Sequence, residues 1–222
     1  MKKKKIWLSW STGKDCAYAL HQLKLNKKYE ITGLLTTLRT PLHSVAMHGT
    51  PEHLLKRQAS ELKLPLYCVK AGFNECQQSF EQQIKTLLKT ASDQKVSYIA
   101  FGDLFFEEIR SYREEKMKGT GIDLLFPLWQ KPTAELARSI IHSGFKAVIT
   151  SINLKILPIS FLGRTYDEKF LADLPSNIDP CGENGEFHTF VYDGPIFQHP
   201  IAIDFGEITV EGDHSFIQLN SM

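Results

Sequence analysis

Two short stretches of the chain gather residues that could bind and activate a substrate. The first, residues 11–16, combines small side chains and a glycine with a lysine and an aspartate, between an apolar run at 6–8 and a helical pattern at 17–23. A glycine at such a strand-to-helix turn lets backbone N–H groups close on a phosphate, and the helix dipole adds to the attraction. The sequence therefore predicts a nucleotide site that comprises Ser11, Thr12, Gly13, Lys14, Asp15 and Cys16.

The second stretch, residues 181–189, is denser still in polar and ionisable groups. It holds Glu183, Glu186, His188 and Thr189 among glycines. Carboxylates of this kind can bind Mg2+, orient a cationic substrate or accept protons. A polar hairpin with solvated acids is the alternative, but a loop with so much chemistry favours a functional role.

A third group follows an apolar strand-like segment. Gly102 and Asp103 close that segment, where a nucleotide or a metal would lie. Arg110, Arg113 and Glu114 are spaced three and four residues apart, so they share one face of a helix. Either the arginines bind substrate or the helix is an ion-paired surface helix.

Two further residues are candidates with plain structural alternatives. His48 lies beside a turn at Gly49, where a histidine is either a site residue or a cap or surface side chain. Arg164 follows Gly163 and forms a candidate anion clamp, unless it simply pairs with Asp167.

The elements that must position these residues alternate in type through the first half. The order is strand 6–10, helix 13–26, strand 29–37, helix 51–62, strand 66–69, helix 74–90 and strand 97–101. Such alternation implies crossover connections and a mostly parallel sheet, so we predict an α/β fold. Ligands of such sheets bind beyond the C-terminal ends of the strands, where the loops 10–15, 36–49 and 102–106 lie.

The pattern changes near residue 130. A helix is predicted at 133–142, a strand at 147–153 and a helix at 163–174, followed by a turn-rich stretch at 175–185 and β-like segments to the C-terminus. We therefore expect two domains, a nucleotide-binding α/β domain over 1–129 and a smaller α+β domain over 130–222.

Composition narrows the class of protein. The chain has 222 residues, 42% of them hydrophobic and 23% charged, with a net charge of +1, which argues against a general nucleic-acid or membrane surface. No apolar run reaches transmembrane length and no signal-peptide core is present. The four cysteines form no C-x-x-C pair, which is typical of cytoplasmic thiols. The sequence leaves open whether the chain forms a homo-oligomer.

The first stretch matches neither of the two commonest phosphate loops. A Walker A loop needs a glycine at Leu8 and a Ser or Thr at Asp15, and the dinucleotide fingerprint needs three spaced glycines. The stretch instead resembles the PP-loop, S-G-G-x-D-S, of the ATP pyrophosphatases, which cleave ATP between the α and β phosphates. Thr12 replaces a glycine of that pattern and Cys16 replaces a serine.

Four blocks together resemble the diphthine–ammonia ligase family of the adenine nucleotide α-hydrolase-like superfamily. They are residues 9–15, residues 47–51 with 58–59, residues 101–103 continuing through 110 to 113–114, and residues 181–189. The block G-E-N-G-E-F-H-T at 182–189 is the specific one, and the loop form S-T-G-K-D resembles that of bacterial members.

The resemblance implies a Rossmann-like ATP-binding domain followed by a substrate domain. It also implies ATP-dependent amidation with ATP and Mg2+, in which a carboxylate and ammonia give an amide, AMP and pyrophosphate. The acceptor would be a small-molecule or protein-borne carboxylate, and free ammonia would supply the nitrogen. The loop 183–189 would then fold back to face residues 11–15, because acceptor and α-phosphate must approach to roughly 3–3.5 Å.

The resemblance also assigns roles to residues. Lys14 and the amides of residues 11–16 would neutralise the departing pyrophosphate, and Asp15 would hold Mg2+. His48, Gly102 and Asp103 would lie near the nucleotide. Glu183, Glu186 and His188 would be catalytic together with Lys14 and Asp15, one glutamate taking a proton from ammonium. The acceptor would be bound by Arg113, Arg164, Glu183, Asn184, Glu186 and Thr189.

Two other functions stay open at this point. One is a non-catalytic module in which an adenine nucleotide controls a partner, which the acid-rich second stretch disfavours. The other is an RNA-modifying PP-loop enzyme. The spacing of Cys68, Cys76 and Cys181 and the low net charge argue against that second alternative.

Overall fold

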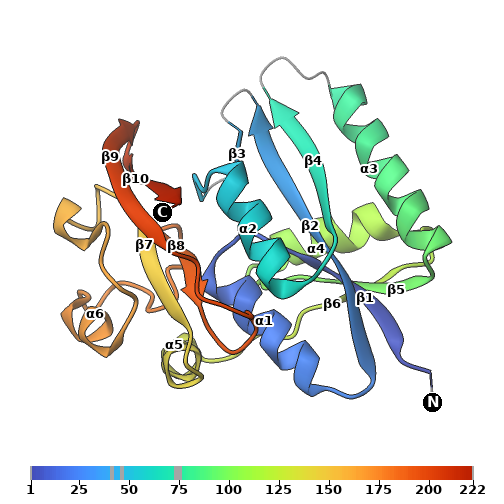
Figure 1. Cartoon of the computed structure of the whole chain (residues 1–222), viewed down its shortest axis with the longest axis horizontal. Coiled ribbons are helices and arrows are strands. Elements are labelled where there is room, and N and C mark those ends of the chain that lie inside the picture. The colour runs from blue at the N-terminus through green and yellow to red at the C-terminus, as the bar shows by residue number, and fades with distance from the viewer. Residues whose placement is uncertain (1, 41–42, 46–47, 73–76, 222) are drawn as a thin grey trace.

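The computed structural model describes residues 2–40, 43–45, 48–72 and 77–221. Its first half forms a sheet in the order β3-β2-β1-β5-β6, with β4 also paired to β2 (Figure 1). The strands are β1 (Lys4–Ser9), β2 (Tyr29–Thr40), β3 (Ser44–Val45), β4 (Leu66–Gly72), β5 (Val96–Ala100) and β6 (Asp123–Leu125). All of these pairings are parallel except that of β2 with β3. The predicted parallel α/β sheet is therefore confirmed.

Helices cover both faces of this sheet. They are α1 (Lys14–Leu25), α2 (Glu52–Leu62), α3 (Gln77–Asp93) and α4 (Glu107–Met117). Side chains alternate between the faces along β1: Ile6 and Leu8 pack in the cluster that contains α1 and α2, whereas Trp7 packs with residues of α3. A short turn, residues 10–13, joins the C-terminal end of β1 to the start of α1.

The second half is built on an antiparallel sheet in the order β8-β7-β10-β9. Its elements are α5 (Thr133–His142), β7 (Lys146–Asn153), a short 3-10 helix (Ile159–Phe161), α6 (Glu168–Asp173), β8 (Phe187–Asp193), β9 (Ile203–Glu211) and β10 (His214–Ser221). The predicted helix at 133–142 and the predicted strand at 147–153 are confirmed within one residue. A smaller α+β part therefore follows the parallel sheet.

The helix predicted at 163–174 is wrong in its first half. Residues 163–166 instead form a turn at Gly163 and a short stretch bridged to β7 at Thr165. The N–H of Gly163 donates to the carbonyl of Ile149 and the N–H of Tyr166 donates to the carbonyl of Ala147. The helix begins only after Asp167, whose side chain accepts a hydrogen bond from the N–H of Phe170. Pairing with a distant strand has outweighed the local helical pattern.

Some predictions concern residues that the structure does not describe. Met47, in the second block of the family pattern, and Cys76 are among them, as are the residues just before α3, so the predicted start of that helix at 74 is not tested. The predicted loop 36–49 is shorter than expected, because β2 continues to Thr40.

The two halves pack against each other through α1 and α2 (Figure 1). Leu54 of α2 lies in one buried cluster with Val148, Phe190 and Leu219 of the second sheet. The N–H of Val191 also donates to the carbonyl of Thr12, at 3.0 Å. The division into domains at residues 129 and 130 stays a prediction.

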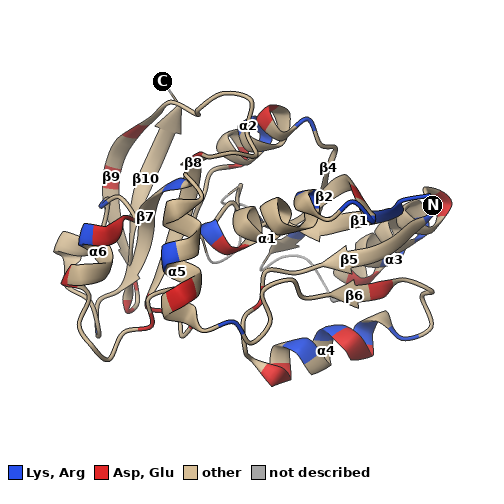
Figure 2. Cartoon of the chain, turned by 90° about the horizontal axis from the view of Figure 1, so that it is seen from below, with Lys and Arg blue, Asp and Glu red and all other residues tan. Residues whose placement is uncertain are grey.

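Charges of both signs are interspersed on the surface, most visibly along α4 (Figure 2). Arg110 there pairs with Glu114 one turn along the same helix. Among the described helices, none has both the length and the apolar character that crossing a membrane requires.

Candidate active site

A cavity of about 320 Å³ lies where β1 and β5 end and the second half of the chain returns. Its lining from the first half comprises the end of β1 and the turn into α1, His48 before α2, the turn after β5 and one side of α4. The rest of the lining comes from the stretch 181–189. The lining residues are Ser9, Ser11, Lys14, Asp15, Cys16, His48, Gly102, Asp103, Ile109, Arg113, Cys181, Gly182, Glu183, Phe187, His188 and Thr189.

The loop 183–189 therefore faces residues 11–15, as predicted. Thr189 makes the most direct link: its hydroxyl accepts a hydrogen bond from the backbone N–H of Lys14 at 3.1 Å. His48 also contacts Thr189, since its Nδ1 lies 3.3 Å from the carbonyl oxygen of that residue. A carbonyl can only accept, so Nδ1 carries the proton and Nε2 is left as an acceptor.

Two glycines make this close approach between segments sterically possible. A Cβ atom on Gly13 would lie 2.8 Å from Cε1 of His48 and 3.2 Å from the carbonyl of Thr189. A Cβ atom on Gly102 would lie 3.0 Å from the backbone nitrogen of Cys16. Both positions therefore need a residue without a side chain, and the first turn of α1 is left open toward the cavity.

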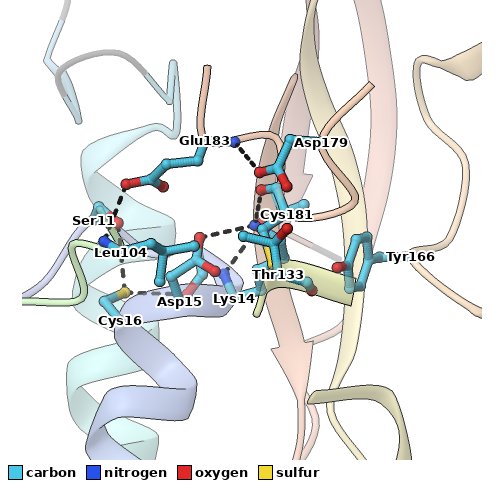
Figure 3. Close-up of polar contacts among 12 residues, drawn as sticks. Ser11, Lys14, Asp15, Cys16, Leu104, Thr133, Tyr166, Asp179, Cys181 and Glu183 are labelled. Carbon is cyan, nitrogen blue, oxygen red and sulfur yellow. Dashed lines mark hydrogen bonds and ion pairs between the residues drawn. The ribbon is translucent and has the colours of Figure 1, made fainter. Parts of the chain in front are cut away.

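Lys14 is a buried cation that faces the second half of the chain (Figure 3). Its Nζ lies 2.8 Å from Oδ2 of Asp15, donates to the carbonyl of Cys181, and sits 5.5 Å from the ring centres of both Tyr166 and Phe187. Burial by itself lowers the pKa of Lys14, but Asp15, Cys181 and Glu183 together outweigh it and the pKa is raised. Neutralisation of pyrophosphate by Lys14 stays a prediction.

Asp15 offers one oxygen that nothing else uses. Its Oδ1 is buried without a hydrogen-bond partner among the described residues, and the residue lines the cavity. Such an oxygen fits a Mg2+ ion, which commonly takes one or two carboxylates and completes its shell with water and phosphate. The described residues contain no cluster of three or more His, Cys, Asp or Glu side chains that could hold a metal by themselves.

Glu183 is the residue best suited to proton transfer. Its Oε1 accepts a hydrogen bond from the N–H of Leu104 at 3.2 Å, and its own N–H donates to Oδ2 of Asp179 (Figure 3). Burial, together with the negative charge of Asp15, raises the pKa of Glu183 to about 7. A carboxyl group that titrates near neutral pH inside a cavity is a candidate acid or base.

Two uncharged imidazoles flank the cavity. The rings of His48 and His188 lie 4.6 Å apart. Burial lowers the pKa of His48 to about 4 and, with the proximity of His48, lowers the pKa of His188 well below its ordinary value. Both rings are therefore neutral at pH 7 and can exchange hydrogen bonds with a ligand without repelling a cation.

Arg113 lines the cavity but already has a partner there. Its guanidinium donates to both carboxylate oxygens of Asp103, at 2.6 and 3.1 Å, and lies 4.1 Å from the ring centre of Phe101. The predicted surface ion pair does occur on this helix, between Arg110 and Glu114. Both arginines are therefore ion-paired, and binding of substrate by Arg113 stays a prediction.

Five predicted site residues do not line the cavity: Thr12, Gly13, Arg164, Asn184 and Glu186. The hydroxyl of Thr12 lies 2.8 Å from the hydroxyl of Thr50. Glu186 is buried and accepts hydrogen bonds from the N–H of Asp179 and the amide of Asn184, so both residues of this pair shape their own loop.

Arg164 lies outside the cavity in contacts of its own. Its guanidinium is 2.7 Å from Oδ2 of Asp173 and lies against the rings of Phe161 and Phe170. The alternative of a pair with Asp167 is wrong, because that carboxylate caps α6 instead.

Sequence reasoning missed several lining residues. Ile109 could have been found, because it lies one helical turn before Arg113 on α4. Phe187 and Cys181 stood inside the dense second stretch without being singled out. Ser9 stood at the start of the first family block, residues 9–15, without being singled out, and it enters the site because β1 ends there.

The thiols of the cavity are not activated. Burial raises the pKa of Cys16 to about 11 and also raises the pKa of Cys181. Both thiols donate to carbonyls, Cys16 to that of Gly13 and Cys181 to that of Thr133. Protonated thiols are poor nucleophiles, which disfavours the thiol chemistry of an RNA-modifying enzyme.

Comparison with known proteins agrees with this geometry. The diphthamide synthase N-terminal domain matches residues 3–124, and the diphthamide synthase C-terminal domain matches residues 132–222. The chain is similar to the diphthine–ammonia ligase of Homo sapiens, with 27% identity over 79% of this chain and 71% of the relative. It is also similar to that of Mus musculus, with 26% identity over 93% and 85% of the two chains. The chain therefore belongs to the diphthamide synthase family.

Proposed function

We propose that this chain is an ATP-dependent amide ligase that joins ammonia to a carboxylate and releases AMP and pyrophosphate. The observation that carries the proposal is the position of Glu183, a carboxyl group with a pKa of about 7, in a cavity that also opens onto the first turn of α1. Membership of the family and the similarity to diphthine–ammonia ligases support it.

The first step would be attack of an acceptor carboxylate on the α-phosphorus of ATP, with release of pyrophosphate and formation of an acyl-adenylate. The backbone N–H groups of the turn before α1 and the helix dipole favour the phosphates at this end of the cavity. Asp15 Oδ1 would hold Mg2+, whose charge stabilises the departing pyrophosphate.

The second step would be attack of ammonia on the acyl carbon, with release of AMP. Ammonia reaches the site mainly as ammonium at neutral pH, so a proton must be removed from the nitrogen before or during attack. The Glu183 carboxylate is suited to take that proton, because its pKa lies near the working pH. The imidazoles of His48 and His188 are neutral, so they do not repel an ammonium ion in the cavity.

The products of ATP cleavage test the proposal. The purified protein is incubated with ATP, Mg2+ and ammonium together with a panel of carboxylic acids and with a protein carrying diphthine. Labelled nucleotides are then separated by chromatography. We expect AMP and pyrophosphate, with release stimulated by one acceptor class. ADP as the sole product, or no cleavage with any acceptor, would contradict an amide ligase of this kind.

A further inference from the structure

Gln58 of α2 is a fully buried polar residue that lies outside the cavity and yet contacts the turn that forms it. The side chain is 0% exposed. Its Oε1 accepts a hydrogen bond from the indole of Trp10 at 2.7 Å. Its Nε2 donates to the carbonyl of Thr12 at 3.1 Å and to the carbonyl of Val191 at 2.7 Å.

The partners leave only one orientation for this amide. The indole N–H of Trp10 can only donate, and the two carbonyls can only accept. Turning the amide of Gln58 over would therefore break all three hydrogen bonds inside a dry core, where unpaired polar groups are costly. The side chain is fixed by what surrounds it.

The residue that Gln58 holds is under backbone strain. Thr12 has a φ of 73°, a left-handed conformation that β-branched residues rarely adopt. Such strain persists only where the surroundings over-determine it. The Thr12 carbonyl receives two hydrogen bonds, from Gln58 and from the N–H of Val191, and its hydroxyl pairs with Thr50.

We propose that Gln58 is a positioning residue for nucleotide binding, one that holds the Thr12 peptide in its strained orientation and docks β8 against it. The inference rests on the proposed function only in taking this turn as the ATP phosphate site. Because Gln58 is joined to both Thr12 and Val191, it links the turn after β1 to the second sheet through a single side chain. α2 lies between the two sheets, as this role requires (Figure 1).

Three variants test the proposal. Gln58→Met keeps the length of the side chain and removes all three hydrogen bonds. Gln94→Met is the matched control, since Gln94 donates to the hydroxyl of Tyr67 on the other face of the first sheet, away from the cavity. Thr12→Gly removes the steric cost of the left-handed conformation and is combined with each of them.

Calorimetric titration with a non-hydrolysable ATP analogue gives the first readout, below the melting temperatures of all variants. We expect Gln58→Met to raise the Kd by about tenfold or more and Gln94→Met to leave it within about twofold. Adding Thr12→Gly should recover part of the loss in the Gln58→Met protein, because glycine adopts the conformation without help. A residue that only stabilises the fold would lower the melting temperature and show no such rescue.

Hydrogen exchange without nucleotide gives the second readout and does not depend on the proposed function. We expect faster exchange at the amide of Val191 and in residues 10–16 of the Gln58→Met protein, and not in the control. If the unmodified protein binds the analogue, an unchanged Kd in the Gln58→Met protein overturns the inference. If the unmodified protein does not bind the analogue, the proposed function fails. In that case, unchanged exchange in residues 10–16 of the Gln58→Met protein overturns the inference separately.

Discussion

The carboxylate of Glu183 accepts a hydrogen bond from the backbone N–H of Leu104, with the two atoms 3.2 Å apart. The acid belongs to the loop before β8 and the N–H to the turn after β5, so one contact spans both halves of the chain. The hydrogen bond by itself lowers the pKa of Glu183, but burial of the carboxylate in this position and the negative charge of Asp15 outweigh it and raise the pKa to about 7. The position of this loop therefore determines the pKa of its glutamate.

The pH dependence of turnover should report Glu183. If its carboxylate takes the proton from ammonium, kcat should rise with pH through a midpoint of about 7, because the base works only when ionised. Glu183→Gln should lower kcat by about 10²–10⁴-fold and abolish that limb, while ATP binding is retained. Steady-state rates of AMP release from pH 5 to 9 measure it. A variant with normal kcat, or an unchanged midpoint, would contradict the assignment, and Glu207→Gln on β9 is the surface control.

The stability of the protein should fall as pH rises through the same range. The pKa of Glu183 is about 7 in the folded chain against 4.5 ordinarily, so the folded state holds the proton more tightly between those values. Stability decreases with pH wherever the folded state binds more protons. Glu183→Gln should therefore gain about 1–3 kcal/mol over the unmodified protein at pH 8, after allowance for solvent screening, and nothing at pH 4. Urea unfolding at both pH values measures the difference, and equal gains would exclude this origin.

The Lys14–Asp15 pair should be needed for the nucleotide. Lys14→Ala and Asp15→Ala should each weaken binding or turnover of MgATP by about 1.5–3 kcal/mol, the loss expected for a charge-assisted contact. Titration calorimetry and AMP release measure these losses. Lys155→Ala is a suitable control, because Lys155 forms an exposed ion pair with Asp213. Unchanged affinity and turnover in both variants, with the fold intact by circular dichroism, would remove these residues from the site.

The cavity thiols should resist alkylation. With a pKa of about 11, the Cys16 thiol is almost wholly protonated at pH 8, and burial raises the pKa of Cys181 as well. Peptide mapping by mass spectrometry after treatment with iodoacetamide should show each of them reacting at least about a hundredfold more slowly than a free thiol. Urea-unfolded protein is the control, since both thiols then become accessible. Rapid labelling of Cys16 in the folded protein would contradict this environment.

Local patterns predicted the elements well where one face of each is buried. The helix at 133–142 has the predicted bounds, because its apolar spacing matches a helix packed on a single face. The helix predicted over residues 163–166 was wrong because these residues contact β7, and no pattern in the local sequence indicates that contact. Spacing also could not decide between Glu183 and Glu186. Which of the two faces the cavity depends on how Asp179 and Asn184 fold the loop around Glu186.

The hydrogen bond between Lys14 N–H and the Thr189 hydroxyl joins residues 175 positions apart in the sequence. During synthesis on the ribosome, the turn before α1 emerges well before β8, the strand that completes it. A nascent chain carrying only the first half would thus present an unfinished phosphate site. Such a late closing contact is also slow to form, since it waits for the closure of a very long loop. A completed nucleotide site therefore marks a chain whose synthesis has passed β8.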